Sequence, residues 1–327
     1  MDFMTLLFNM SAIAIAPTTA ALAIAAIGLN LHFGYTGLLN MGQAGFMLLG
    51  AYGFAVSIEA GLGFWLSLLI SLVVVVIFSF LLGFPTLKLR GDYLSIVTIS
   101  AAEIVRMVGR SSLMGPITGG SNGIPGAQYR DPFNELSFFP EGSTKLLWFE
   151  YENVGVSGWW VRFVAWGLVA LLSVFVWLLI RSPWGRVLKG IREDEDAVRS
   201  LGKSAYAYKM QSLILGGAIG ALAGVIYVIP SSVQPDALGR SMTFFIWTAL
   251  LLGGAATIFG PVLGAILFFV VRIFIQGVTQ MVVPSDIMST QQTDQFSWIL
   301  IGVALMLLVI FRPQGILGNK KELSFNV

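Results

Sequence analysis

The chain has 327 residues, of which 56% are hydrophobic and 11% are charged, and its formal net charge is +2. A soluble domain has about 25% charged residues, so this composition excludes a soluble protein and indicates an all-α, polytopic membrane protein. Cysteine is absent, which excludes disulfides and thiol ligands, and His32 is the only histidine, which excludes a histidine-based metal site or catalytic triad. We therefore expect no cofactor and no metal, and the charge gives no reason to expect a nucleic-acid partner.

The first apolar run, about Phe3 to Leu31, is predicted to be a retained membrane helix that is kinked at Pro17. It is too long for a cleaved signal peptide, and no basic residue precedes it. His32, at its end, is predicted to be a polar residue near the membrane interface.

A second run, Leu29 to Ala55, is interrupted by glycines and contains Asn40 and Gln43 among apolar residues. Close helix packing through small residues explains most of these glycines. The alternative is a broken or re-entrant helix that faces a pathway, because polar groups at membrane depth are tolerated where they are buried in protein or line water.

Two further spans are predicted at about 64–84 and 94–108, and the Lys/Arg-containing turn between them is expected on the cytoplasmic side. The second of these spans contains Glu103 and, one turn later, Arg106. An acidic residue inside a membrane is a candidate for function, but residues three apart on a helix can also form a structural ion pair. The structural pair is the interpretation that we favour. Residues 109–158, which are rich in turns and poor in Lys and Arg, are predicted to form an external segment.

The long polar stretch 182–209 separates two apolar runs that are each long enough to cross a bilayer, which takes about 20 residues. A Lys/Arg excess of this kind marks the cytoplasmic side. We predict an amphipathic helix from Ile191 to Leu201 that is stopped by Gly202. The basic residues in and beside the stretch are Arg181, Arg186, Lys189, Arg192, Arg199, Lys203 and Lys209.

Residues 241–269 contain several glycines and Pro261, and they predict either two spans joined by a tight turn or one re-entrant element. A last span is expected at Phe296 to Phe311, after an external turn that includes the sequence QQTD. In total we expect about 8 to 10 transmembrane segments with broken Gly-rich helices. The residues 1–327 then form a single transmembrane domain with its N-terminus outside and its C-terminus in the cytoplasm.

The tripeptide Gly202-Lys203-Ser204 resembles part of a phosphate-binding loop, but that motif needs a glycine where this chain has Ala197. No nucleophile–base arrangement or paired carboxylates stand out, so we predict that the chain is not an enzyme. No soluble segment is large enough to bind and hydrolyse ATP. If ATP drives transport, the motor is another polypeptide.

Several stretches together resemble the LivM-type permease subunit of branched-chain amino acid ABC importers. They read LKLRGDYLSIVTISAAEIVRMV (87–108), TGGSNGIPG (118–126), GRVLKGIREDEDAVRSLGKSAYAYK (185–209), LLGGAATIFGPVLGA (251–265) and FRPQGILG (311–318). The resemblance covers nearly the whole chain. It implies a multi-pass subunit of the bacterial plasma (inner) membrane, in contact with membrane lipid, that pairs with a homologous second permease, two cytosolic ATP-binding subunits and a periplasmic or extracellular substrate-binding protein.

The resemblance also implies that 182–209 is a cytosolic coupling loop whose short helix docks on an ATPase. In this family such helices carry an acidic residue followed by two alanines and then, after three intervening residues, a glycine. This chain departs from the pattern with Val198 in place of the second alanine. A rigid helix on such a loop can transmit ATPase closure to the membrane helices, and its charges complement the partner. The predicted coupling residues are Arg192, Glu193, Asp194, Glu195, Asp196, Ala197 and Gly202.

The solute implied by the resemblance is a branched-chain amino acid, and related permeases carry other neutral amino acids or urea and short amides. From polarity at membrane depth, we predict that Asn40, Gln43 and Thr98 line the pathway. An alternative of another class is a stand-alone secondary transporter that uses Glu103 as a proton or ion site.

Overall fold

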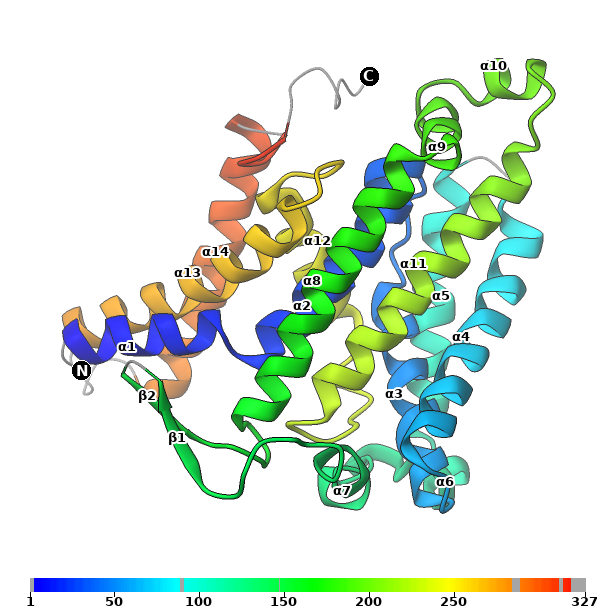
Figure 1. Cartoon of the computed structure of the whole chain (residues 1–327). Helices are drawn as coiled ribbons and strands as arrows, with labels where there is room; N and C mark the ends of the chain where they lie inside the picture. The colour runs from blue at the N-terminus through cyan, green and yellow to red at the C-terminus, as the bar shows by residue number, and fades with distance from the viewer. Residues whose placement is uncertain (1–2, 89–90, 147, 284–288, 312–313, 319–327) are drawn as a thin grey trace.

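The computed structural model describes residues 3–88, 91–146, 148–283, 289–311 and 314–318. The chain folds into a helical bundle, as the composition predicts (Figure 1). Within these described residues, the stretches that are long and apolar enough to cross a membrane are Pro17–Tyr35, Phe64–Thr86, Trp159–Arg181, Ala205–Val228 and Gly260–Val282. The principal helical elements are α1 (Phe3–Ala14), α2 (Pro17–Asn30), η1 (Leu31–Tyr35), α3 (Gln43–Glu59), α4 (Phe64–Thr86), α5 (Gly91–Arg110), α8 (Trp159–Arg181), α11 (Ala205–Val228), α12 (Arg240–Gly253), α13 (Gly260–Val282) and α14 (Thr290–Phe311).

Helix α11 packs against α2, α3 and α4 in the centre of the bundle. Glycines allow these backbones to approach closely, as small residues do in membrane helices. A Cβ atom added to Gly50 of α3 would lie 2.5 Å from the Cα of Ala221 on α11, and one added to Gly224 would collide with the carbonyl oxygen of Met47. The predicted role of these glycines in helix packing is therefore confirmed.

The first apolar run is not one kinked helix, as predicted, but two separate helices. Ala16 is extended, with φ −65° and ψ 148°, and Pro17 starts α2. The residue before a proline avoids the helical region, and proline itself suits the first helical position. Figure 1 shows that α1 lies crosswise to the bundle axis, where Leu6 packs on Gly277 of α13.

Two other boundaries differ from the sequence prediction, and one stretch follows the first of the two alternatives that the sequence left open. Pro85 lies inside the last turn of α4 instead of ending the span. The stretch 241–269 forms two helices, α12 and α13, because residues 254–259 are irregular and Pro261 occupies the first turn of α13, where its missing N–H costs nothing. Helix α14 begins at Thr290, so the residues QQTDQ are helical and not part of a turn.

Residues 109–158 gather at the lower end of the bundle in Figure 1. Their backbone is tied to the end of α11: Ile124 pairs with Val233 in an isolated antiparallel bridge, and the Tyr129 hydroxyl donates to the carbonyl of Val228 at 2.8 Å. Burial raises the pKa of Tyr129, so this hydroxyl stays protonated. The segment contains η2 (Ser112–Met114), α6 (Gly115–Thr118), η3 (Gly120–Asn122), η4 (Gly126–Gln128), α7 (Asp131–Asn134) and the antiparallel hairpin β1 (Ser143–Leu146) and β2 (Phe149–Glu152).

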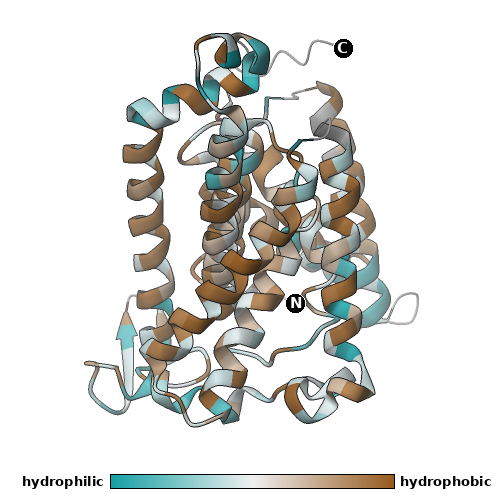
Figure 2. Cartoon of the chain, turned by 90° about the vertical axis from the view of Figure 1, so that its right-hand side faces the viewer, coloured by the Kyte–Doolittle hydropathy of each residue, from teal (hydrophilic) through white to brown (hydrophobic). Residues whose placement is uncertain are grey.

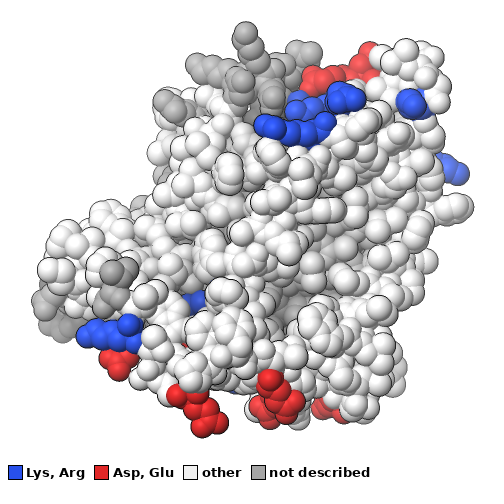
Figure 3. All heavy atoms as spheres, viewed as in Figure 1, with Lys and Arg blue, Asp and Glu red and all other residues white. Residues whose placement is uncertain are grey.

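The opposite end carries α9 (Pro183–Glu193) and α10 (Glu195–Ser200) (Figure 1). Apolar residues follow the helix shafts and hydrophilic residues lie towards the two ends, as Figure 2 shows. On the face seen in Figure 3, Lys and Arg gather at the end with α9 and α10, and Asp and Glu predominate at the opposite end. Helix α4 has a lipid-facing surface, because its exposed positions are all apolar while Ser67, Ser71 and Ser79 are fully buried.

Candidate functional site

A break between two core helices brings several buried polar side chains together. The helix that begins at Pro17 ends in the π-helical turn η1, and α3 starts only at Gln43. Gly37, between them, has φ +75°, a conformation that favours glycine. The side chains of His32, Asn40 and Gln43 lie at this break, and each is 0% exposed. Buried polar groups must be hydrogen-bonded, so the break has to supply its own partners.

Asn40 is the centre of this hydrogen-bond network. Its side-chain nitrogen lies 3.1 Å from Nδ1 of His32 and donates to Oε1 of Gln43 at 3.0 Å, while its side-chain oxygen accepts from the N–H of Gly42 at 2.8 Å. The Nε2 atom of His32 lies 3.1 Å from the carbonyl oxygen of Leu213 on α11. A carbonyl can only accept, so Nε2 carries the proton and Nδ1 accepts from Asn40. His32 is therefore buried within the protein with both ring nitrogens bonded, and its predicted place near the membrane interface stays a prediction.

Thr98 reaches the same break from α5. Its hydroxyl accepts from the N–H of Met41 at 3.0 Å, and on the other side Trp247 of α12 donates its indole N–H to the carbonyl of Asn40 at 3.1 Å. The structure thus brings Asn40, Gln43 and Thr98 together, but their predicted contact with solute is a separate question that stays a prediction. The sequence analysis did not identify Trp247. It could have been found because an indole N–H group inside an apolar helix needs a hydrogen-bond acceptor.

The predicted helix from Ile191 to Leu201 is broken into the end of α9 and the whole of α10. Asp194 lies between them in an extended conformation, and its carboxylate accepts from the N–H groups of Asp196 and Ala197, both at 3.0 Å. Aspartate is a strongly preferred N-cap, which explains why a new helix starts here. Gly202 ends α10 with φ +74°, as predicted.

The acidic residues of the loop are partly paired within it. Glu193 lies 2.6 Å from Arg192, and Glu195 lies 2.6 Å from Arg199. The side chains of Glu193 and Asp196 are nevertheless 64% and 91% exposed. Exposed ion pairs contribute only about 0–1 kcal/mol, so these carboxylates can exchange partners at low cost.

Arg192 connects the loop to the helix break. Its side chain is 13% exposed, and its guanidinium donates to the carbonyl oxygen of Gly34 in η1 at 2.5 Å. One turn earlier in α9, the ammonium of Lys189 lies 6.0 Å from the centre of the Tyr35 ring. These two contacts join α9 to the turn that contains His32. The sequence singled out Arg192 but not this contact.

Glu103 and Arg106 form the predicted ion pair, at 2.5 Å, near the lower end of the bundle. Two residues from the α11–α12 region extend it: Asp236 pairs with Arg106, and Arg240 lies 3.4 Å from Glu103. The Glu103 carboxylate is thus engaged by two guanidinium groups. This arrangement favours a structural role over an ion site.

Comparison with known proteins identifies the family. The sequence matches, over residues 11–310, the family described as branched-chain amino acid transport system / permease component. The chain belongs to this family. It is 34% identical over 324 residues to the high-affinity branched-chain amino acid transport system permease protein LivM of Escherichia coli (strain K12), which covers 93% of this chain and 69% of that protein.

The permease is also 26% identical over 333 residues to the probable branched-chain amino acid transport permease protein LivM of Methanocaldococcus jannaschii, with 91% of this chain and 90% of that protein covered. Among solved structures, it resembles a chain of PsaBC from Streptococcus pneumoniae in complex with Fab, with a TM-score of 0.44 and 16% identity over 93% of this chain and 91% of that chain.

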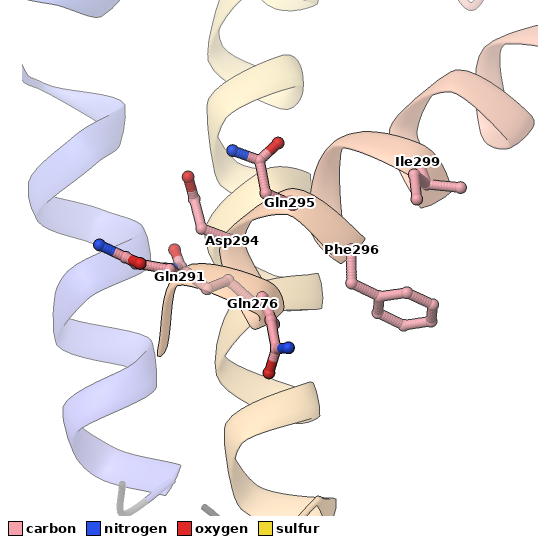
Figure 4. A pocket seen from close by; sticks show the side chains of 7 residues that line it. Gln276, Gln291, Asp294, Gln295, Phe296 and Ile299 are labelled. Carbon is pink, nitrogen blue, oxygen red and sulfur yellow. The ribbon is translucent and has the colours of Figure 1, made fainter. Parts of the chain in front are cut away.

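The permease has a cavity of about 820 Å³ where α13 meets the start of α14 (Figure 4). Four glutamines and one aspartate are among its seven lining residues, although most of the surface that lines this open cavity is apolar. Sequence reasoning missed this site because the QQTDQ segment was assigned to an external turn. The lining residues are Gln276, Gln291, Gln292, Asp294, Gln295, Phe296 and Ile299.

Proposed function

We propose that this permease is the membrane-spanning subunit of an ATP-driven importer and that, with a homologous second permease, it forms the translocation pathway for branched-chain amino acids. The family match over residues 11–310 carries this proposal. The two relatives described above, both called LivM in their names, support the solute class. The chain itself neither hydrolyses ATP nor catalyses a reaction.

The proposed partners are the second permease, two cytosolic ATP-binding subunits, an external substrate-binding protein and the surrounding lipid. The end of the bundle with α9 and α10 lies in the cytoplasm, because Lys and Arg accumulate there (Figure 3). This orientation puts residues 109–158 outside the plasma (inner) membrane. Of the predicted cytoplasmic C-terminal tail, residues 314–318 are described, and the N–H groups of Ile316 and Leu317 donate to the carbonyls of Leu252 and Gly253, both at 3.0 Å. Residues 319–327, like the first two residues, lie outside the described part of the chain, and we retain both terminus assignments as proposals.

The proposed coupling element is the loop 182–209. Helix α10 presents Asp196 and the tip at Leu201, which is 80% exposed, to a partner. Arg192 and Lys189 join α9 to η1, so a push on the loop is transmitted to the helix break. Coupling of this kind needs an element with two discrete arrangements. We propose that this element is the helix interrupted by the π-helical turn η1 and the six non-helical residues 37–42.

Asn40, Gln43 and Thr98 remain our proposal for the inner part of the pathway. Their side chains are fully buried here and bonded within the chain. They would meet solute only in a conformation in which the break between η1 and α3 opens. Uptake rate and solute range that stay unchanged in correctly inserted Asn40→Ala and Gln43→Ala variants would exclude this role.

The experiment for the proposed function is co-purification followed by reconstitution in liposomes. We expect two ATPases and a second permease to be recovered with this chain, and uptake of leucine, isoleucine and valine to require ATP and the binding protein. Charge reversal across Glu193 to Asp196 should uncouple ATP hydrolysis from uptake while membrane insertion is retained. Transport by the isolated chain down an ion gradient, abolished by Glu103→Gln, would instead establish a secondary transporter.

A further inference from the structure

The cavity between α13 and α14 differs in chemistry from the lipid-facing surface of the bundle. Helix α4 exposes only apolar residues, whereas α14 exposes Gln291, Gln292 and Gln295 beside the cavity. An amide without a hydrogen-bond partner costs several kcal/mol in hydrocarbon. Lipid is therefore a poor neighbour for this face, and water or a polar solute is a good one.

An ion pair within the helical span of α13 lies beside this cavity, and only its aspartate lines the cavity. Arg272 lies near the middle of α13, about 18 Å from Gly260 and about 15 Å from Val282 at 1.5 Å per residue. Its guanidinium donates to Oδ1 of Asp294 at 2.7 Å, and Asp294 lines the cavity. An ionisable pair inside a membrane segment is costly and is a functional candidate by default.

The guanidinium is held firmly but not completely satisfied. It stacks 4.3 Å from the ring of Trp298, which in turn stacks on Phe245 at 4.6 Å. The Nε atom of Arg272 is buried and has no hydrogen-bond partner among the described residues. A buried, unpaired donor on a charged group costs free energy.

We propose that this cavity is a transient binding site for a zwitterionic α-amino acid with an aliphatic side chain. The α-ammonium group would pair with Asp294 and the α-carboxylate with Arg272, while Gln276 and Gln295 would hydrogen-bond to the same groups. The apolar side chain would lie against Phe296 and Ile299. The inference rests on the proposed function and names the contact that such a solute makes during passage.

The ion pair explains why a zwitterion is favoured over urea or a short amide. Separating Arg272 from Asp294 without compensation leaves two partly buried charges unpaired, which is unfavourable. A zwitterion brings one charge of each sign and can replace both halves of the pair, whereas a neutral amide cannot. The cavity volume of about 820 Å³ falls in the ordinary range for small-molecule sites, about 300–1,000 Å³.

The test uses the assembled transporter in liposomes with saturating leucine-loaded binding protein. We expect Asp294→Asn to lower the maximal rate of leucine uptake by about 10- to 100-fold. Because that change also leaves Arg272 unpaired, Gln276→Leu provides a second variant that keeps the ion pair; it should slow uptake by about tenfold. Gln128→Leu, in the external segment, is the matched control and should have no effect.

A selectivity measurement separates solute contact from a merely structural role. Phe296→Ala should lower the ratio of leucine to alanine uptake by about three- to tenfold while recovery of the assembled complex is unchanged. Unaltered rates and ratios in all three variants would overturn the proposal. Loss of the second permease from complexes of the variants would also overturn it, by identifying the face as a subunit interface. A wild-type transporter that carries no branched-chain amino acid would instead refute the proposed function.

Discussion

Replacing Arg192 by methionine tests whether the cytosolic loop acts on the membrane core through one contact. Methionine keeps much of the apolar stem but loses the hydrogen bond to the Gly34 carbonyl, which measures 2.5 Å. A hydrogen bond to a charged group contributes about 1.5–3 kcal/mol, and 1.4 kcal/mol is a factor of ten. An equilibrium between conformations that keep and lose this contact should therefore shift by about 10- to 150-fold.

The assay is the number of solute molecules imported per ATP hydrolysed by the reconstituted transporter. We expect Arg192→Met to lower this number at least tenfold, because the loop can then move without displacing η1. Arg199→Met is the matched control: Arg199 lies on the same loop, is 56% exposed and forms only surface ion pairs, so its loss should cost less than a factor of two. If both variants behave alike, the proposed transmission through Arg192 is wrong.

Three further predictions concern stability. Gly50→Leu should lower the melting temperature in detergent because overpacking costs about 1–3 kcal/mol, whereas Gly63→Leu, with open space around it, should not; equal melting temperatures would refute the close helix packing. Trp247→Phe leaves the buried carbonyl of Asn40 unpaired and should cost about 1–3 kcal/mol, measured by the same method. Burial raises the pKa of Tyr129 above its ordinary value of 10.0, so the folded state holds this proton more tightly and stability should fall as pH rises above 10. Tyr129→Phe should lack this alkaline loss, and an unchanged pH profile would contradict the assignment.

Several local features could be predicted because they depend on neighbouring residues alone. Gly202 ends its helix with positive φ, and Glu103 pairs with Arg106 one turn away. The errors arose where a local rule competed with another. Pro17 was assigned to a kink but starts a new helix, and Asp194 was included in a helix that it instead divides by capping the next one.

The site was predicted only in part. Asn40 and Gln43 stood out because polar side chains are rare inside apolar runs, and they do lie together. The hydrogen bonding of His32 could not be predicted because its carbonyl partner, Leu213, lies 181 residues away in sequence. The polar cavity at α14 was overlooked because a run of glutamines resembles a solvated turn when the helix that faces it is unknown.

The sequence by itself determined that this chain is a helical membrane protein, which end carries the basic loop, and which family it belongs to, because apolar run length, Lys/Arg distribution and motifs are local properties. Only the tertiary structure decided that Arg192 bonds Gly34 across 158 residues and that Trp247 bonds Asn40 across 207. The physical reason is that a buried donor must find an acceptor, but many acceptors satisfy that need equally well. Which one is used depends on how the helices pack, and no local pattern encodes that choice.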